Sequence, residues 1–247
     1  IADIHGNADA LLAVMADLAT VSPDLVVNLG DCLSGPLQAA RTADLLMAQN
    51  WPTVRGNHDR WLISPPDPDG TWEVMCRPML MPAHLDWLAS LPATRTIGPT
   101  YLCHATPQDD LTYWLHSPLP PGIMAPRPQD QVAALAQGIE HPLILCGHTH
   151  LAAAVRLADG RLIVNPGSVG SPGYTDDHPI PHAVNAGTPH ACYALLDERP
   201  GGGWAITFRQ VPYDTTNAVA LAQTAGSREW ASALATGWTT SGHDPAA

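Results

Sequence analysis

The sequence predicts an α/β (α+β) protein in which two packed mixed β-sheets are flanked by helices. Short strand-like runs alternate with helical periodicity up to about residue 150, and antiparallel strand signals follow. Apolar residues make up 45% of the 247-residue chain, which is enough for a substantial core. Because no internal repeat or long linker interrupts this order, we expect one domain over residues 1–247, with a core over 1–214 and a helical tail over 215–247.

The elements of the first part follow from their hydrophobic periodicity. Leu11, Met15 and Leu18 stand at helical spacing and predict a helix over residues 7–20. Similar patterns predict helices over residues 37–49, 82–91 and 129–137. Short β-type runs between the helices predict strands over residues 25–29, 52–55, 101–103 and 143–146.

The second part of the chain favours antiparallel strands. Apolar runs over residues 151–157 and 162–164 flank an Asp159-Gly160 turn and predict a hairpin. Two further strands are expected over residues 191–196 and 204–211, and one or two short helices from residue 217 onward.

Three Pro-rich stretches show neither the helical nor the strand pattern of apolar residues. They cover residues 64–81, 106–127 and 170–190. Unpatterned loops of this length in a compact domain are either functional lids or disordered. We therefore expect them to carry substrate specificity.

Composition excludes several classes of function. Eleven Lys+Arg against 23 Asp+Glu give a net charge of −12, and every basic residue is arginine. Mechanisms that need a lysine, such as a Schiff base or a P-loop, are therefore excluded. An acidic chain without basic runs also argues against extended nucleic acid as a partner.

Cysteine usage and hydropathy indicate the compartment. The five cysteines are widely spaced and form no CxxC pair, which is typical of reduced, buried thiols in a cytoplasmic protein. No apolar run approaches the roughly 18 residues of a membrane span, so no membrane partner is expected. Only two residues precede the first motif and the chain lacks an initial Met, so we expect strand residues upstream of Ile1.

Residues that can bind metal ions cluster where the predicted strands end. They are Asp3, His5, Asp31, Asn57, His104, His148 and His150. The carboxyl ends of strands are where α/β proteins gather ligands, and seven oxygen and imidazole donors suit two divalent cations. Alternate residues of a strand face one side. We therefore expect both side chains of Asp3-x-His5 to reach one cation, and His148-x-His150 to do the same from the opposite side. Two such ions against two aspartates leave about +2, which attracts an anionic phosphate ester.

These motifs resemble, in their order, those of the calcineurin-like metallophosphoesterase superfamily. The matching segments are Asp3-x-His5-Gly6-Asn7, Gly30-Asp31, Gly56-Asn57-His58-Asp59, His104 and Gly147-His148-Thr149-His150. The turn at residues 165–168 resembles the downstream part of the family's small bacterial and archaeal phosphodiesterase branch. The resemblance covers most of the chain to about Asp214, apart from the three Pro-rich stretches, and implies a four-layer sandwich.

The resemblance also implies a binuclear metal centre. It assigns Asp3, His5, Asp31 and His150 to one ion, and Asp31, Asn57, His104 and His148 to the other. A hydroxide between the ions would attack phosphorus, and His58 would protonate the leaving alkoxide. Asp59 is expected to orient His58. Asn7 either contacts phosphate or caps the following helix, and Arg60 either clamps phosphate or is an ordinary surface arginine.

The implied function is a metal-dependent phosphoesterase, a hydrolase that acts on a small phosphoester or nucleotide. Phosphodiesters are favoured, with phosphomonoesters and dinucleoside polyphosphates as alternatives. The donor set suits Mn, Fe, Zn, Ni or Co, and we favour Mn²⁺ for activity. A different class is a protein-binding scaffold of the same fold, like the retromer subunit, which lacks the histidine corresponding to His58. A metal sensor without turnover is a third class, and the oligomeric state is left open.

Overall fold

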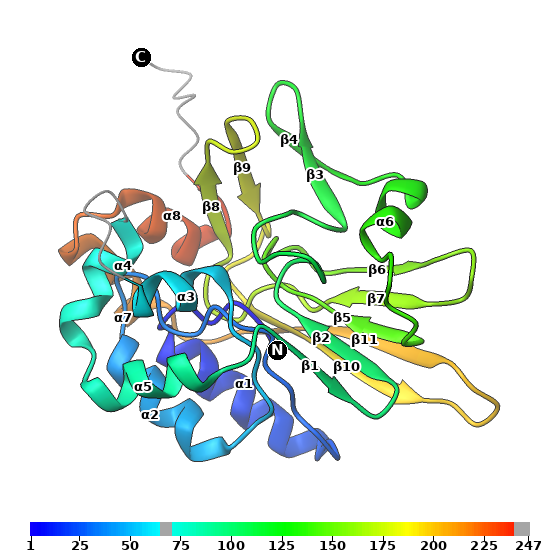
Figure 1. Cartoon of the computed structure of the whole chain (residues 1–247). Coiled ribbons are helices and arrows are strands. Elements are labelled where there is room, and N and C mark those ends of the chain that lie inside the picture. Colours follow the sequence, from blue (N-terminus) through cyan, green and yellow to red (C-terminus); the bar gives the residue numbers. More distant parts are fainter. Residues whose placement is uncertain (65–70, 240–247) are drawn as a thin grey trace.

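Two β-layers lie face to face between layers of helices (Figure 1). The computed structural model describes residues 1–64 and 71–239. One layer is a five-stranded sheet in the order β1-β2-β5-β7-β6. Its strands are β1 (Thr94–Ile97), β2 (Thr100–Cys103), β5 (Leu143–Leu145), β6 (Ala153–Arg156) and β7 (Leu162–Asn165). The inner strands β2, β5 and β7 run parallel, and both edge strands pair antiparallel, so the mixed sheet is confirmed.

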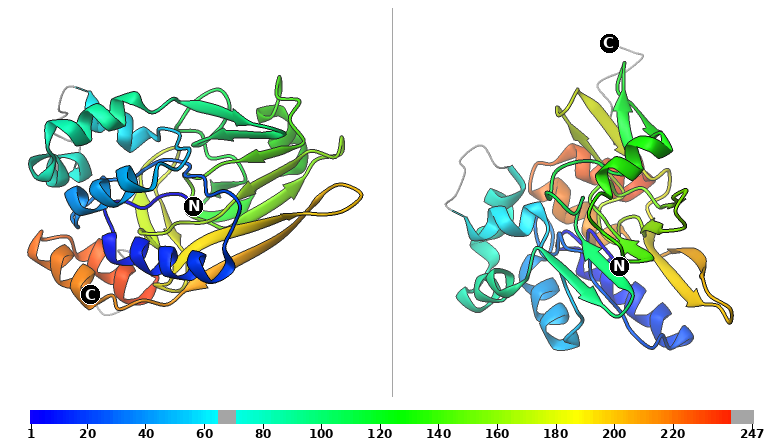
Figure 2. Two further views of the ribbon diagram at one scale, coloured as in Figure 1. Left: turned by 90° about the horizontal axis from the view of Figure 1, so that it is seen from below. Right: turned by 45° about the vertical axis from the view of Figure 1, so that its right-hand side comes forward.

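The second layer is built around the antiparallel hairpin of β10 (Ala191–Glu198) and β11 (Trp204–Val211). Extended segments continue it by backbone hydrogen bonds: Cys192 N donates to Ser168 O, and Val169 N donates to Ala2 O. Leu29 N in turn donates to Ile1 O. Figure 2 shows the hairpin between the five-stranded sheet and helix α1 (Ala8–Val21).

The strands predicted over residues 25–29 and 52–55 are wrong as regular elements. Only an isolated parallel bridge joins Asn28 to Thr53. Both segments end soon after this bridge, because Gly30 and Asp31 take left-handed φ angles of 96° and 54° and a helix begins at Asn57. Backbone pairing with the N-terminal segment remains, so these residues still extend the second layer.

The core lies on both faces of the five-stranded sheet. Leu162 and Val164 of β7 pack toward the second layer, and Ile163 between them packs on the opposite face. This alternation explains why β5 and β7 are fully buried, since both of their faces are covered.

Helices complete the two outer layers. The predicted helices are confirmed as α1, α2 (Ala39–Gln49), α5 (Pro82–Ser90) and α6 (Gln129–Leu135). The first three pack on the second layer, and α6 packs on the five-stranded sheet through Val132. An unexpected helix, α3 (Asn57–Ile63), begins inside the third motif. The tail expected over residues 215–247 forms α7 (Thr216–Thr224) and α8 (Arg228–Thr236), and its residues 240–247 lie outside the described residues.

The three Pro-rich stretches contain regular structure that their sequence did not indicate. The first holds α4 (Thr71–Cys76) and a 3₁₀ turn (Arg77–Met79), and its residues 65–70 lie outside the described residues. The others hold two hairpins, β3 (His116–Leu119) with β4 (Ile123–Pro126), and β8 (Gly173–Asp176) with β9 (His182–Asn185). Both hairpins stand out from the same side of the molecule (Figure 1), and β4 packs against β9.

The structure also bears on the cysteines and on membrane-spanning helices. All five cysteines lie among the described residues, and each is buried and free of a disulfide. Within residues 1–64 and 71–239, none of the helices combines the length and the apolar character that crossing a bilayer would require.

Candidate active site

Five of the seven predicted metal ligands lie in left-handed turns. The φ angles are 55° at Asp3, 50° at His5, 54° at Asp31, 71° at His148 and 55° at His150. A left-handed conformation costs a non-glycine residue on the order of 1–3 kcal/mol and concentrates at functional sites. These ligands thus lie in tight turns that follow the extended segments. We expected alternate positions of a strand to align them, and this expectation is wrong.

The first group of ligands is Asp3, His5 and His150, all buried. Their candidate ligand atoms all lie within 4.8 Å of one another. Nε2 of His5 is 3.1 Å from Nε2 of His150, which in turn is 3.5 Å from Oδ1 of Asp3. This spacing could accommodate one cation.

The second group is Asp31, His104 and His148. Oδ2 of Asp31 is 3.2 Å from Nε2 of His104 and 3.8 Å from Nε2 of His5. Asp31 therefore reaches both groups, as a bridging carboxylate must.

Each of the four histidines uses its other ring nitrogen to contact a backbone carbonyl. The pairs are His5 Nδ1 with Ser34 O (3.2 Å), His104 Nδ1 with Leu29 O (2.8 Å), His148 Nε2 with Leu111 O (2.8 Å) and His150 Nδ1 with Ser171 O (2.7 Å). A carbonyl only accepts, so the nitrogen facing it carries the hydrogen and the opposite nitrogen of a neutral ring is a bare lone pair. This is how metal-binding histidines are usually oriented.

The Asn57 amide provides a second test of whether cations fit. The atom that it turns inward lies 2.9 Å from His104 Nε2, 3.2 Å from His148 Nδ1 and 3.3 Å from Asp31 Oδ2. The His148 and Asp31 atoms accept hydrogen bonds and favour the amide nitrogen in that position, whereas a cation among these groups would favour the amide oxygen as a ligand. Asn57 thus completes the donor set that the sequence predicted, and the set suits two divalent ions.

Burial and neighbouring charges set the protonation of the histidines. Burial, together with the adjacent His150, lowers the pKa of His5 well below its ordinary value. Burial and the adjacent His104 lower the pKa of His148 to about 4, so both rings are neutral at neutral pH. Burial also opposes charge on His104, but the Asp31 carboxylate outweighs it and raises the pKa of His104 to about 10. A cation would displace that proton.

His58 lies in the first turn of α3, beside the two groups. Its backbone N–H donates to Asp31 Oδ1 (3.0 Å), and its Nδ1 lies 2.5 Å from Glu73 Oε1. Burial lowers the pKa of His58, but Asp31 and Glu73 together raise it above the ordinary value.

Asp59 does not lie against His58, where we expected it. Its carboxylate accepts hydrogen bonds from the backbone N–H groups of Asp31 (2.9 Å), Cys32 (2.8 Å) and Gly56 (3.0 Å). Asp59 therefore holds the Asp31 turn in place from the first turn of α3.

Asn7 and Arg60, the two residues predicted to contact substrate, form hydrogen bonds with other residues of the protein. Asn7 caps α1 by accepting from Ala10 N, and its amide nitrogen donates to Gly170 O and to the Tyr213 hydroxyl. Arg60 forms a two-pronged ion pair with Asp110 at 2.7 and 2.8 Å. Of the alternatives left open for Asn7, helix capping is the one seen.

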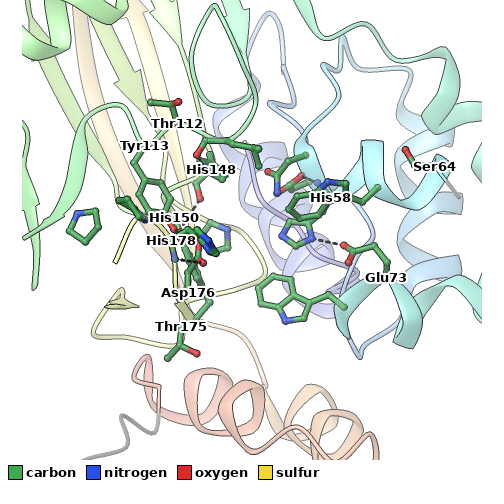
Figure 3. A pocket seen from close by; sticks show the side chains of 18 of the residues that line it. His58, Ser64, Glu73, Thr112, Tyr113, His148, His150, Thr175, Asp176 and His178 are labelled. Atoms are coloured by element: carbon green, nitrogen blue, oxygen red, sulfur yellow. Dashed lines mark hydrogen bonds and ion pairs between the residues drawn. The ribbon is translucent and has the colours of Figure 1, made fainter. Parts of the chain in front are cut away.

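A cavity of about 930 Å³ opens beside the predicted ligands. In Figure 3, His58 and Glu73 stand on one side of it, and Tyr113, His148, His150 and Asp176 stand on the other. Its lining includes several residues that the sequence did not single out as site residues. These are Trp61, Trp72, Glu73, Arg77, Tyr113, Arg127 and Tyr174.

Six of these seven residues come from the Pro-rich stretches, where no period or motif marked them. The Tyr174 hydroxyl donates to that of Tyr113 (3.0 Å), and Tyr113 donates to Asp176 (3.1 Å). Their only sequence signal was the aromatic and charged content of stretches that were otherwise unpatterned.

Comparison with known proteins agrees with the geometry. A family model described as the calcineurin-like phosphoesterase superfamily domain matches residues 1–186. The crystal structure of a metallophosphoesterase from Sphaerobacter thermophilus is 25% identical, with a TM-score of 0.73, over 96% of this chain and 98% of that chain. A search of curated proteins found no match.

Two further solved structures are similar at lower levels. Yfce, a phosphoesterase from E. coli, is 20% identical with a TM-score of 0.42, over 85% of this chain and 97% of that chain. A Vps29 double mutant from Entamoeba histolytica is 16% identical with a TM-score of 0.43, over 86% and 97%.

Proposed function

Because the chain belongs to the calcineurin-like phosphoesterase superfamily, we propose that it is a hydrolase that cleaves phosphodiesters at a binuclear metal centre. The observation that carries this proposal is the convergence of two His/Asp groups on the shared Asp31 carboxylate. The carbonyl-bound histidines direct their remaining nitrogens toward these carboxylates. Cations would satisfy this set of acceptors.

The residues divide between two ions as their positions suggest. Asp3, His5, His150 and Asp31 would hold one, and Asp31, Asn57, His104 and His148 the other. Two divalent ions, for which we propose Mn²⁺, would supply Lewis acidity toward the phosphoryl oxygens and activation of water. His58 would give its proton to the oxygen of the leaving group, because it lies beside the bridging Asp31 and lines the cavity.

The cavity supports a diester substrate. At about 930 Å³ with aromatic walls, it has room for organic groups on both ester oxygens of one phosphate. A phosphomonoester would use less of this space. The scaffold alternative is less favoured, because His58 and every predicted ligand are present and face one another.

The test is turnover of bis(4-nitrophenyl) phosphate and 4-nitrophenyl phosphate by metal-stripped protein with Mn²⁺ added back. We expect metal-dependent turnover with the diester cleaved faster. Asp31→Ala should lose bound metal and activity, whereas Asp24→Ala, which removes an exposed carboxylate far from the ligand motifs, should lose neither.

His58→Ala tests the acid separately. It should keep both metals and lose about 10²–10⁴ in rate on a poor leaving group such as phenolate. If the protein bound two metals but turned over neither chromogenic substrate, the scaffold or sensor class would replace the enzyme.

A further inference from the structure

Two consecutive residues of α4 hold the His58 imidazole. Glu73 Oε1 lies 2.5 Å from its Nδ1, and the ring of Trp72 stacks on it with centroids 4.8 Å apart and planes 13° apart. The Glu73 side chain is only 13% exposed and that of His58 18%. The contact is therefore largely shielded from water, which strengthens it. In Figure 3 a dashed line marks this contact between His58 and Glu73 on one side of the cavity.

A carboxylate at Nδ1 determines what the rest of the ring can do. It accepts the Nδ1 hydrogen, so Nε2 is the nitrogen left for chemistry. It also stabilises the imidazolium from which Nε2 gives up its proton, as the acidic member of a catalytic triad does. Asp59 does not take this part, because its carboxylate faces the backbone N–H groups of Asp31, Cys32 and Gly56, whereas Glu73 faces His58 Nδ1.

Trp72 connects this contact to the rest of the site. Its ring also meets His5 edge-on at 5.1 Å, Trp230 of α8 at 4.9 Å and Tyr174 of β8 at 6.4 Å. The imidazole of His58 is thus fixed by stacking as well as by a hydrogen bond.

We propose that Glu73 is the positioning residue of the general acid His58, and that Trp72 fixes the plane of the same ring. This inference rests on the proposed phosphoester hydrolysis. As the bond from phosphorus to the leaving oxygen breaks, that oxygen takes the proton from His58 Nε2. The Nδ1 hydrogen stays on the ring, hydrogen-bonded to the Glu73 carboxylate, and solvent water then returns a proton to Nε2.

The test compares two diesters of similar size that differ in the leaving group. Bis(4-nitrophenyl) phosphate releases a stabilised phenolate that needs little protonation, whereas diphenyl phosphate releases a poor leaving group. Glu73→Gln should lower kcat about 10- to 100-fold on diphenyl phosphate and only about threefold on the nitrophenyl ester. Glu73→Asp should recover part of the loss.

A double variant and a spectrum separate positioning from a general structural effect. Glu73→Gln should cost nothing further in a His58→Ala background, because both residues act in one step. On Zn²⁺-loaded protein at a pH above the pKa of His58, where its ring is neutral, the ¹⁵N signals of His58 should show the Nδ1–H tautomer in the wild type and a mixture in Glu73→Gln. Asp44→Asn is the matched control, since it removes the carboxylate of another His–Asp pair, with His84 at 3.1 Å, on the outer helices.

The outcomes distinguish the proposals. Equal losses on both diesters, additive losses in the double variant, or an unchanged tautomer would assign Glu73 a merely structural role and overturn this inference while the hydrolase stands. A wild-type protein that cleaves neither diester with metal bound would overturn the proposed function and this inference together.

Discussion

At the scale of single residues, the main chain orients most of the predicted ligands. All four imidazoles face backbone carbonyls, and Asp3 accepts from the backbone N–H of His148 at 3.1 Å. Main-chain partners cannot be removed by substitution. Among the four histidines, His5 is the one for which the structure also records a side-chain partner at the carbonyl-bound nitrogen, Ser34 Oγ at 2.9 Å from Nδ1.

Ser34→Ala should therefore weaken metal binding while leaving the fold intact. Partners behind a metal-binding histidine are typically worth about 10- to 100-fold in affinity. We expect a loss near the lower end, because Ser34 O remains at 3.2 Å from the same nitrogen. Competition with a chromogenic chelator for Zn²⁺ measures it. Ser90→Ala, which removes an exposed hydroxyl bonded to Trp87 O, is the control, and equal affinities in the two variants would contradict the expectation.

At the scale of elements, what the sequence could predict depended on periodicity. The helices α1, α2, α5 and α6 and the strands β2, β5, β10 and β11 carry clear apolar patterns and were predicted near their observed bounds. The predicted ligands could be found for a related reason, since each follows a patterned segment. The structure brings six of them into two neighbouring groups, with Asn57 beside the second group.

The elements that sequence analysis missed lack such a pattern. The hairpins β3–β4 and β8–β9 are short, rich in proline, and buried in part against each other rather than on the main core. Glu73 could not be found either, because its meaning depends on a contact with His58 made across a stretch without motif or period. Contacts of this kind arise from tertiary packing, which one sequence does not display.

One contact between elements predicts a pH effect. The Asp17 carboxylate of α1 accepts a hydrogen bond from Arg209 Nε of β11 (2.7 Å) and another from the Tyr193 hydroxyl of β10 (2.6 Å). The hydrogen bonds from Arg209 and Tyr193 lower the pKa of Asp17 below its ordinary value of 3.8. A lowered pKa in the folded state stabilises the protein above the unfolded pKa, and that stability is lost as pH falls through the folded value.

Asp17→Asn should therefore reduce the free energy of unfolding at pH 7, with the difference from wild type shrinking as pH falls below about 4. Urea unfolding at several pH values between 7 and 3 measures this difference. Asp86→Asn, which removes an exposed carboxylate of α5, should show a smaller effect. A difference that stayed constant with pH would mean that Asp17 acts through packing instead of charge.

At the scale of the whole molecule, metal binding and stability should be linked. The proposed metal site brings together carboxylates and imidazoles in left-handed turns, so ions that bind the folded state alone would stabilise it. Mn²⁺ at about 100 times its Kd should add about 2.7 kcal/mol per site to the free energy of unfolding.

Thermal unfolding of chelator-treated protein, with and without Mn²⁺, measures this stabilisation. Tm should rise with Mn²⁺ concentration in the wild type and stay flat in Asp31→Ala, since that variant loses the carboxylate shared by both groups. A similar rise in both proteins would place the stabilising ions elsewhere.

The sequence separation within the first group has a consequence for how the protein is made. His5 and His150 lie 145 residues apart, and the carbonyl that orients His150 belongs to Ser171. A ribosome adding about 5–20 residues per second needs roughly 7 to 30 s to cover that interval. The proposed metal site is therefore complete only after Ser171 has been added, well after the segment of helix α1 (Ala8–Val21) has been synthesised.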